Sequence, residues 1–237
     1  MTDPLVTPPA IDVAPARSSA WEDVLDIFYA PRAVFERRRD GKYLVPILVL
    51  CVATVAVYFL SQQMNDALRD VELARTFREQ GLKPEQISQA TAAAAKFSGL
   101  AVYILPVFMA IGAWISGLMT MLLGNMMGAK LNFAQGTTIA VLASMPELLG
   151  RLLVGLQGLF LDTTTAAHRY SFSINASRLM SADTNKWLLK FGALVDPFVI
   201  WGLVLTGIGA YVIGRMEREK AAVLAIMIGI VGTLLFR

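Results

Sequence analysis

The stretch LAVYILPVFMAIGAWISGLMTMLL, residues 100–123, decides the class of fold, because it runs for 24 residues without a charged side chain. An α-helix needs about 20 apolar residues to cross the hydrocarbon core of a bilayer. The whole chain of 237 residues is 56% hydrophobic and only 16% charged, where a soluble domain carries about 25% charge. The sequence therefore predicts a polytopic membrane protein and excludes a disordered chain or an ordinary cytosolic domain.

Four other apolar stretches accompany this one. The predicted spans cover residues 43–61, 100–123, 137–160, 193–213 and 217–236. The loops 62–99 and 161–192 are predicted to be helical and external; in the first, Gly81 ends one helix and Pro84 begins the next. We therefore expect an all-α fold, in which residues 43–237 form a bundle of five transmembrane helices after an N-terminal amphipathic helix at the membrane surface.

The chain before the first span divides into two parts. Residues 1–18 are rich in proline and are predicted to be a flexible tail. Residues 19–42 have the pattern of an amphipathic helix in the lipid headgroup layer, where it can contact a partner; the alternative is a helix that simply packs beneath the bundle. The residues that define this segment are Trp21, Leu25 and Phe28 on one face, and Arg37, Arg38 and Arg39 at its basic end.

The distribution of Lys and Arg predicts the orientation in the membrane. An odd number of spans places the two termini on opposite sides, and the basic residues of the loops and tails are divided equally between these sides. The basic run before the first span decides the question, because cytoplasmic segments next to a span are enriched in Lys and Arg. We expect a cytoplasmic N-terminus and an external C-terminus.

The third predicted span carries two charged residues, Glu147 and Arg151, which lie on one helix face because they are four residues apart. Charged side chains at bilayer depth are costly and indicate a functional site by default. Asp196 and Gln157 are the other intramembrane polar candidates. Two interpretations stay open: a structural ion pair that holds the third span against Asp196 or Gln157, or a role in transport or ligand binding.

Glycines are concentrated in the predicted spans, where small residues let helix backbones approach closely. A flexible pore or hinge is the alternative interpretation. The glycines predicted to pack helices together are Gly112, Gly117, Gly124, Gly128, Gly202, Gly207 and Gly209.

Residues that usually carry catalysis or bind metals are scarce. Cys51 is the only cysteine and His168 the only histidine, which excludes an internal disulfide and any metal site with two histidines. His168 falls in a predicted loop and is expected to be solvated, so the spans lack the histidine of CAAX-type and rhomboid-like proteases. We expect no enzyme activity, no cofactor and no metal, and the net charge of +3 does not indicate nucleic-acid binding.

Several short motifs occur in a familiar order. They are Asp26-Ile-Phe-Tyr-Ala-Pro31 before the first span, Gly128-Ala-Lys-Leu-Asn-Phe-Ala-Gln135, Pro146 in the third span, and Asp196-Pro-Phe-Val-Ile-Trp201 with Gly207-Ile-Gly209 in the fourth. With five spans, this order resembles the Yip family of membrane proteins, and most closely its bacterial branch. The resemblance implies a five-span fold and a location in a bacterial inner membrane. Eukaryotic members of the family bind prenylated Rab-type GTPases, a partner that we do not expect for a bacterial member.

The sequence leaves two functional hypotheses. The first is a non-enzymatic scaffold or accessory subunit that interacts with a partner membrane complex, with membrane lipid, or with further copies of itself. The second is a transporter or channel for a small solute, ion or lipid, built around Glu147, Arg151 and Asp196. The hypotheses differ in whether these charges line a water-accessible cavity or lie in a dry core.

Overall fold

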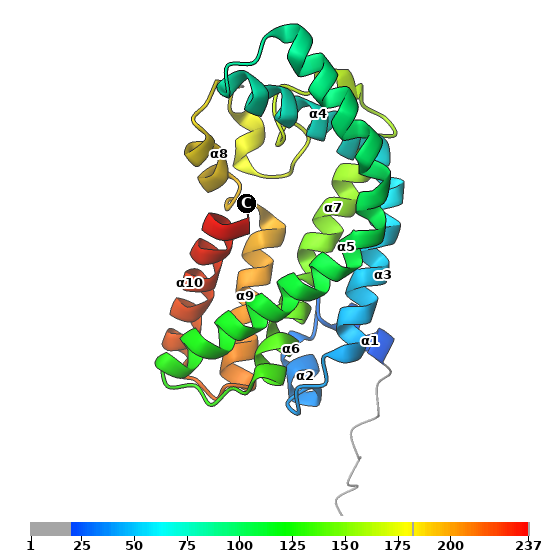
Figure 1. Cartoon of the computed structure of the whole chain (residues 1–237). Helices are drawn as coiled ribbons and strands as arrows, with labels where there is room; N and C mark the ends of the chain where they lie inside the picture. The colour runs from blue at the N-terminus through cyan, green and yellow to red at the C-terminus, as the bar shows by residue number, and fades with distance from the viewer. Residues whose placement is uncertain (1–19, 182, 237) are drawn as a thin grey trace, which may run out of the picture.

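Apolar helices run along the length of the molecule, and a smaller group of helices and loops covers one end of them (Figure 1). This computed structural model describes residues 20–181 and 183–236, so the predicted tail 1–18 lies outside the described residues. Every regular element within the described ranges is helical, which confirms the all-α fold. The elements are α1 (Ala20–Asp26), α2 (Pro31–Arg37), α3 (Leu44–Leu60), α4 (Gln62–Glu79), α5 (Pro84–Met126), α6 (Phe133–Ala143), α7 (Met145–Gln157), η1 (Thr163–Thr165), η2 (Ala176–Leu179), α8 (Lys186–Gly192), α9 (Pro197–Val212) and α10 (Arg218–Phe236), where η marks a 3-10 helix.

Two segments of the described chain are long and apolar enough to cross a membrane: Val102–Met126 within α5, and Phe133–Gln157, which comprises α6 and α7. The number rises to four if each of two bent pairs counts as one span, α3 with α4 at 80° and α8 with α9 at 63°. α3 alone has 17 residues, at the lower limit of about 17–25 for a span. Apolar membrane helices are therefore present, whereas the count of five stays a prediction.

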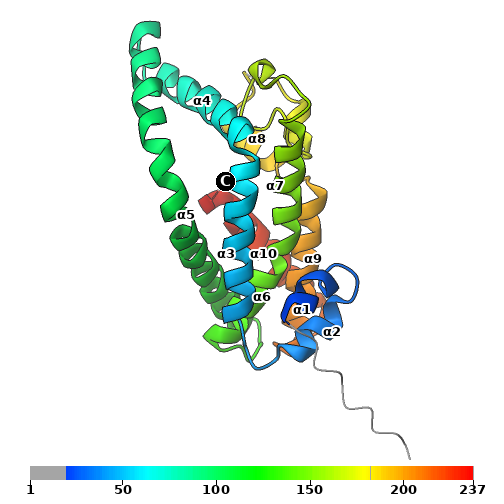
Figure 2. The same cartoon turned by 90° about the vertical axis from the view of Figure 1, so that its right-hand side faces the viewer.

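α5 joins the end of the predicted loop 62–99 and the predicted span 100–123, which were expected to be separate helices. Gly81, with φ +79°, ends the turn after α4, and Pro84 begins α5, as predicted. α5 then continues for 43 residues from the predicted loop into the predicted span. Pro106 lies inside it, and the helix bends along its length (Figures 1 and 2), as expected where a proline removes a backbone hydrogen bond.

The two ends of the bundle differ in structure. α1 and α2 lie at one end, beside the turns that join α5 to α6 and α9 to α10 (Figure 1). At the other end α4, α8 and the connection between α7 and α9 form what we call the cap, residues 62–79, 158–181 and 183–196. α10 contacts α8 of the cap, so the described chain begins and finishes at opposite ends.

α6 forms the centre of the hydrophobic core. It packs against α3, α5 and α9, and its residues Ile139, Val141 and Leu142 are completely buried. Phe35 from α2 and Leu205 from α9 are completely buried in the same core. A helix that is apolar on all sides is stable only when other helices surround it. α6 therefore sets the positions of the helices around it.

Three of the predicted glycines lie at very close helix contacts. A Cβ atom at Gly202 of α9 would lie 2.7 Å from the carbonyl oxygen of Ala143. One at Gly209 would lie 2.9 Å from the Cγ2 atom of Ile139, and one at Gly117 of α5 would overlap Thr137 of α6. These three positions leave no room for a side chain, because the neighbouring atoms belong to buried helices.

The other four predicted glycines have more room. A Cβ atom at Gly124 would lie 3.1 Å from a methyl group of Leu131, and one at Gly207 would make only ordinary contact. Gly112 and Gly128 would have no atom within 4 Å of a Cβ, so no close contact between described residues requires a glycine at these two positions, and their role in helix packing stays a prediction. Gly128 has φ +94° and makes the turn after α5 possible, and Gly112 borders a cavity.

Candidate functional site

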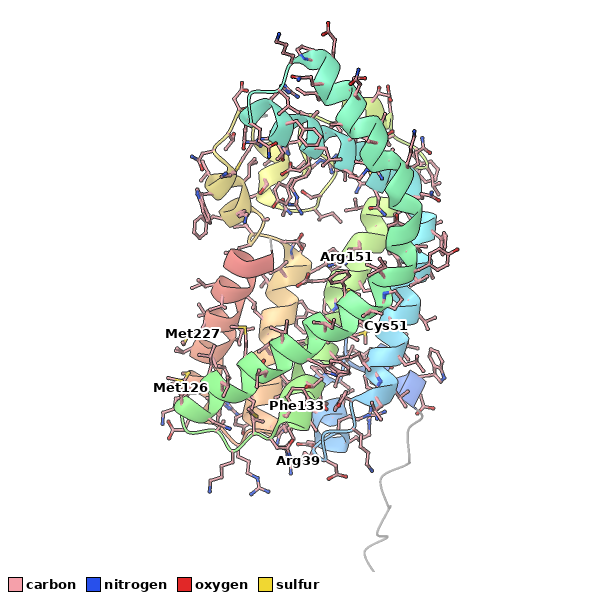
Figure 3. All side chains as sticks on the ribbon, viewed as in Figure 1. Arg39, Cys51, Met126, Phe133, Arg151 and Met227 are labelled. Atoms are coloured by element: carbon pink, nitrogen blue, oxygen red, sulfur yellow. The ribbon has the colours of Figure 1, made fainter. Side chains whose placement is uncertain are left out.

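The charged residues of the predicted third span lie on α7, a helix between α3 and α9 (Figure 2). Pro146 falls in the first turn of α7, where a proline is tolerated, and the break at Ser144 separates α7 from the buried α6. Arg151 lies six residues before the last residue of α7, which at 1.5 Å per residue is roughly 9 Å from the cap. Figure 3 places Arg151 between the two ends of the molecule, far from Arg39 at the end that carries α1 and α2.

A cavity of about 520 Å³ lies beside this part of α7, and we call it the polar cavity. α3, the start of α4, α7, the start of α9 and the cap enclose it. Glu147, Arg151 and Asp196 all line it, so the structure brings three of the four predicted intramembrane candidates together. Its other polar lining residues are Thr54, Tyr58, Ser61, Asn65, Arg169, Tyr170, Ser173 and Asn175.

A second cavity of about 380 Å³, the apolar cavity, adjoins the first. Both are lined by Glu147, Arg151 and Val199. The hydroxyl groups of Thr120, Ser144 and Thr206 border the apolar cavity but donate to carbonyl oxygens of their own helices. The surface presented there is therefore mainly hydrocarbon, contributed by Leu50, Phe108, Met109, Ala113, Leu203 and Ile228.

Some polar groups of the polar cavity have no partner within the described part of the chain. The Ser61 hydroxyl is buried, with the residue only 4% exposed, and makes no hydrogen bond there. Arg151 is exposed toward the cavities and takes part in no ion pair formed among the described residues. A buried polar group without a partner costs about 1–3 kcal/mol. Arg151, whose guanidinium is accessible and lines both cavities, indicates a site that receives water or a polar ligand.

Asp196 and Gln157 have structural partners. Asp196 caps α9, since its Oδ1 atom accepts hydrogen bonds from the backbone N–H groups of Phe198 at 2.8 Å and Val199 at 3.3 Å. Gln157 is not among the residues that line either cavity. Its Nε2 atom donates to the carbonyl oxygen of Phe172 at 3.0 Å, which attaches the cap to the end of α7.

His168 is buried in the cap, which corrects the expectation that it is solvated. Its Nε2 atom lies 2.9 Å from the carbonyl oxygen of Met180, and its Nδ1 atom lies 3.2 Å from the backbone nitrogen of Tyr170. A carbonyl needs a donor and an N–H needs an acceptor, so this geometry assigns the neutral tautomer with its proton on Nε2. His168 thereby fixes the backbone that carries Arg169 and Tyr170 to the polar cavity.

Arg169 and its neighbours are the functional candidates that the sequence did not reveal. The Arg169 guanidinium carbon lies 5.2 Å from the centroid of the Tyr170 ring, a cation–π contact, and both residues line the polar cavity. Asn65 and Asn175 line the same cavity from α4 and the cap. Polar residues are common in loops, so no local pattern distinguishes these from their neighbours.

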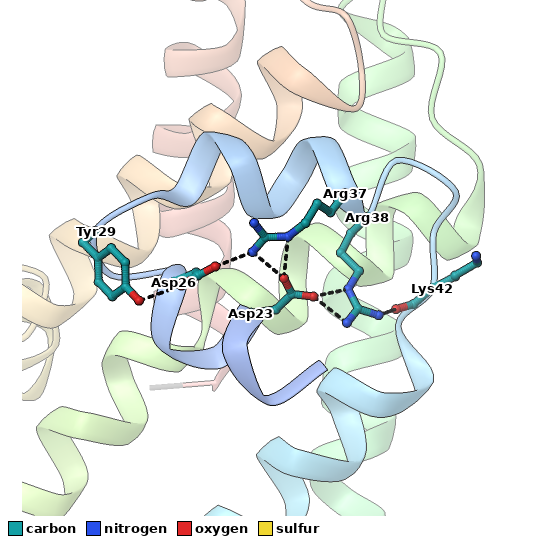
Figure 4. A network of polar contacts seen from close by, with 6 residues as sticks. All are labelled: Asp23, Asp26, Tyr29, Arg37, Arg38 and Lys42. Carbon is teal, nitrogen blue, oxygen red and sulfur yellow. Dashed lines mark hydrogen bonds and ion pairs between the residues drawn. The ribbon is translucent and has the colours of Figure 1, made fainter. Parts of the chain in front are cut away.

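The N-terminal helices carry a second polar cluster, at the far end of the bundle (Figure 4). Asp23 is only 1% exposed; Arg37 Nη2 lies 2.6 Å from its Oδ1 atom, and Arg38 Nε lies 2.6 Å from its Oδ2 atom. Arg37 also reaches Asp26, at 2.6 Å. Two of the three arginines predicted to face lipid or a partner therefore pair within the segment, and only Arg39 is exposed.

The pKa of the Asp26 carboxyl in this cluster is displaced from its ordinary value. A hydrogen bond from the Tyr29 hydroxyl, at 2.6 Å, and then the Arg37 guanidinium lower the pKa of Asp26 below its ordinary value of 3.8. A lowered pKa means that the ionised carboxylate stabilises the fold above pH 3.8, and that this contribution is lost as the pH falls through the lower pKa of the folded state.

The predicted apolar face of the N-terminal segment is divided by the structure. Trp21 is 67% exposed and Leu25 is 64% exposed, whereas Phe28 packs against the hydrophobic core. Ile27, Val34 and Phe35 provide the completely buried contacts of this segment. α1 and α2 are thus attached to the bundle, while the side chains of Trp21 and Leu25 remain exposed on its surface.

The apolar helices and the cavity between them define an integral membrane protein of all-α structure. The chain belongs to the Yip1 domain family, whose family profile matches residues 25–236. The resemblance to the Yip family is confirmed by this match. Searches against curated proteins and against solved structures found no significant match.

Proposed function

We propose that this protein is a non-enzymatic accessory protein of the membrane that binds a lipid between its helices and serves a partner membrane complex. The observation that carries the proposal is the pair of adjoining cavities that share Glu147 and Arg151, of which the first is lined by more polar side chains than the second. A membrane lipid has the same division into a polar head and apolar chains. Both volumes, about 520 and 380 Å³, fall within the range of about 300–1,000 Å³ that is typical of small-molecule sites.

A transporter for a small solute, ion or lipid is the second candidate. It is favoured by Arg151, which is exposed toward a cavity instead of being sealed in a dry core. Flux of a lipid analogue between the two leaflets of a vesicle that contains the purified protein separates the candidates. A lipid-binding accessory protein leaves the rate of an empty vesicle unchanged, whereas a lipid transporter raises it.

Lipid binding can be tested by filling the apolar cavity. Gly112 borders this cavity, and a Cβ atom there meets no atom within 4 Å, so Gly112→Phe adds a ring to open space. We expect about tenfold less lipid to co-purify with this variant in mild detergent, measured by mass spectrometry of the extract. Val107→Phe is the matched control, because Val107 lies on α5, is 56% exposed and lines neither cavity. Equal lipid content in the two variants would remove the apolar cavity as the binding site.

We further propose that the N-terminus faces the cytoplasm of a bacterium and that the cap faces outward. Asp40 and Thr164 are both exposed; Asp40 lies between α2 and α3, at the end of the bundle that carries α2, and Thr164 lies in η1 of the cap at the other end. In a Cys51→Ala background, Thr164→Cys should react with a membrane-impermeant thiol reagent in intact cells, with the outer membrane permeabilised, and Asp40→Cys should not. After lysis both should react. The reverse pattern in intact cells would invert the orientation.

A further inference from the structure

We infer that the ligand is a phospholipid and that Arg151 recognises its phosphate group. This inference rests on the proposed function and adds the chemistry of the ligand. A phospholipid carries a phosphodiester between its polar head and its acyl chains. Arg151 occupies the equivalent place in the protein, because it lines both the polar and the apolar cavity.

Two cations, Arg151 and Arg169, and two carboxylates, Glu147 and Asp196, line the polar cavity, and within this set the hydrogen-bond donors without a partner favour an anion. The side chains of Arg151 and Asn65 line the cavity, make no hydrogen bond to another described residue and can donate. Asp196 is the opposite case, since its Oδ1 atom already accepts two backbone hydrogen bonds from α9. The available donors near Arg151 therefore match the acceptor oxygens of a phosphate. A guanidinium is also the side chain best suited to it, because its planar donors can bind two phosphate oxygens at once.

The depth of the site fits a lipid of the leaflet nearer the cap. Arg151 lies roughly 9 Å from the end of α7, and a long arginine side chain can direct its charge toward the membrane surface. Arg169 adds a second cation at the side of the cap, held over the Tyr170 ring. A phosphate between these two arginines would place the remaining head group in the polar cavity and the acyl chains beside the apolar cavity.

The test compares diacylglycerol with phospholipids that add a phosphodiester head group to the same acyl chains. The full-length protein in detergent is titrated with phosphatidylethanolamine, phosphatidylglycerol and diacylglycerol of identical acyl chains, and bound lipid is counted by native mass spectrometry. We expect both phospholipids to bind about tenfold more tightly than diacylglycerol. Arg151→Gln should remove this difference, Arg169→Gln should reduce it, and the exposed Arg78→Gln on α4 should preserve it.

Competition by glycerol phosphate and binding by the variants separate the possible outcomes of this experiment. Glycerol phosphate that competes as strongly as a phospholipid would assign the site to a soluble phosphate compound and overturn the inference. Equal binding of diacylglycerol, or an unchanged preference in the Arg151→Gln variant, would overturn phosphate recognition and leave lipid binding intact. If no lipid binds and Gly112→Phe has no effect, the proposed function fails as well. The preference of the unmodified protein tests recognition of the phosphodiester head group even if a variant does not fold.

Discussion

Asp23→Ala should lower the free energy of unfolding by about 3 kcal/mol, a larger effect than any other charge removal that we expect in the N-terminal segment. Asp23 accepts hydrogen bonds from both Arg37 and Arg38, and its own side chain is only 2% exposed. Removing the carboxylate leaves two partly buried guanidinium groups without their shared partner. The estimate lies at the low end of the range for a broken buried pair, because the side chain of Arg37 is 28% exposed and water can solvate it.

The measurement is a thermal melt in detergent, combined with the rate of tryptic cleavage in residues 31–42. Asp23→Ala should lower the melting temperature and speed cleavage, because the ion pairs that hold α1 against α2 would be lost. Glu36→Gln is the matched control: Glu36 pairs with Arg32 at the surface, with side chains 43% and 67% exposed, and exposed pairs contribute little. A melting temperature as high as that of the control would mean that the arginines find other partners and that the cluster does not hold the segment in place.

The class of fold could be predicted because a membrane-spanning helix requires a long run of apolar residues without charge, which is visible in the sequence. A run such as residues 100–123 has one stable location, the hydrocarbon core. The full length of α5 could not be predicted in this way, because its first part lies outside the apolar run. Between Lys96 and the apolar run the sequence has no proline, so the loop helix and the membrane helix join in one continuous element.

The N-terminal segment illustrates what helical periodicity misses. The repeat that places Trp21 and Leu25 on one face is local, and the structure leaves both residues exposed. The pairing of Asp23 with Arg37 spans 14 residues and two helices. Spacing along the sequence cannot specify it, because it depends on the angle between α1 and α2. Basic residues expected at the lipid surface therefore proved to be internal partners.

The candidate site was predictable only where charge stands out. Glu147 and Arg151 were found because their neighbours are apolar, whereas Arg169 and Asn65 belong to segments where polar residues are ordinary. Asp196 was identified for the same reason as Glu147, yet its clearest role is a helix cap that the following Pro197 makes possible. The distinction between a ligand site and a cap depends on hydrogen-bond directions, which the sequence does not contain.

The largest effect of all should come from Gly117→Leu, which tests the contact between α5 and the buried α6. A Cβ atom at Gly117 would lie 2.5 Å from the Cα atom and 2.7 Å from the backbone nitrogen of Thr137. The reciprocal position, Gly136, lies against the carbonyl oxygen of Gly117. Both clashes involve backbone atoms, so no change of side-chain rotamer can relieve them. The two helices must move apart, and we expect a loss of at least about 3 kcal/mol, at the upper end of the range for overpacking.

Gly112→Leu provides the control, because it makes the same change five residues earlier on the same helix. A Cβ atom at Gly112 meets open space, and leucine is a better helix former than glycine. Its melting temperature in detergent should therefore equal or exceed that of the unmodified protein, while Gly117→Leu should melt far lower and Gly117→Ala should fall between them. If Gly117→Leu and Gly112→Leu melt together, α5 can shift away from α6 at little cost. In that case the arrangement of α5 and α6 around the two cavities would not be fixed by this contact.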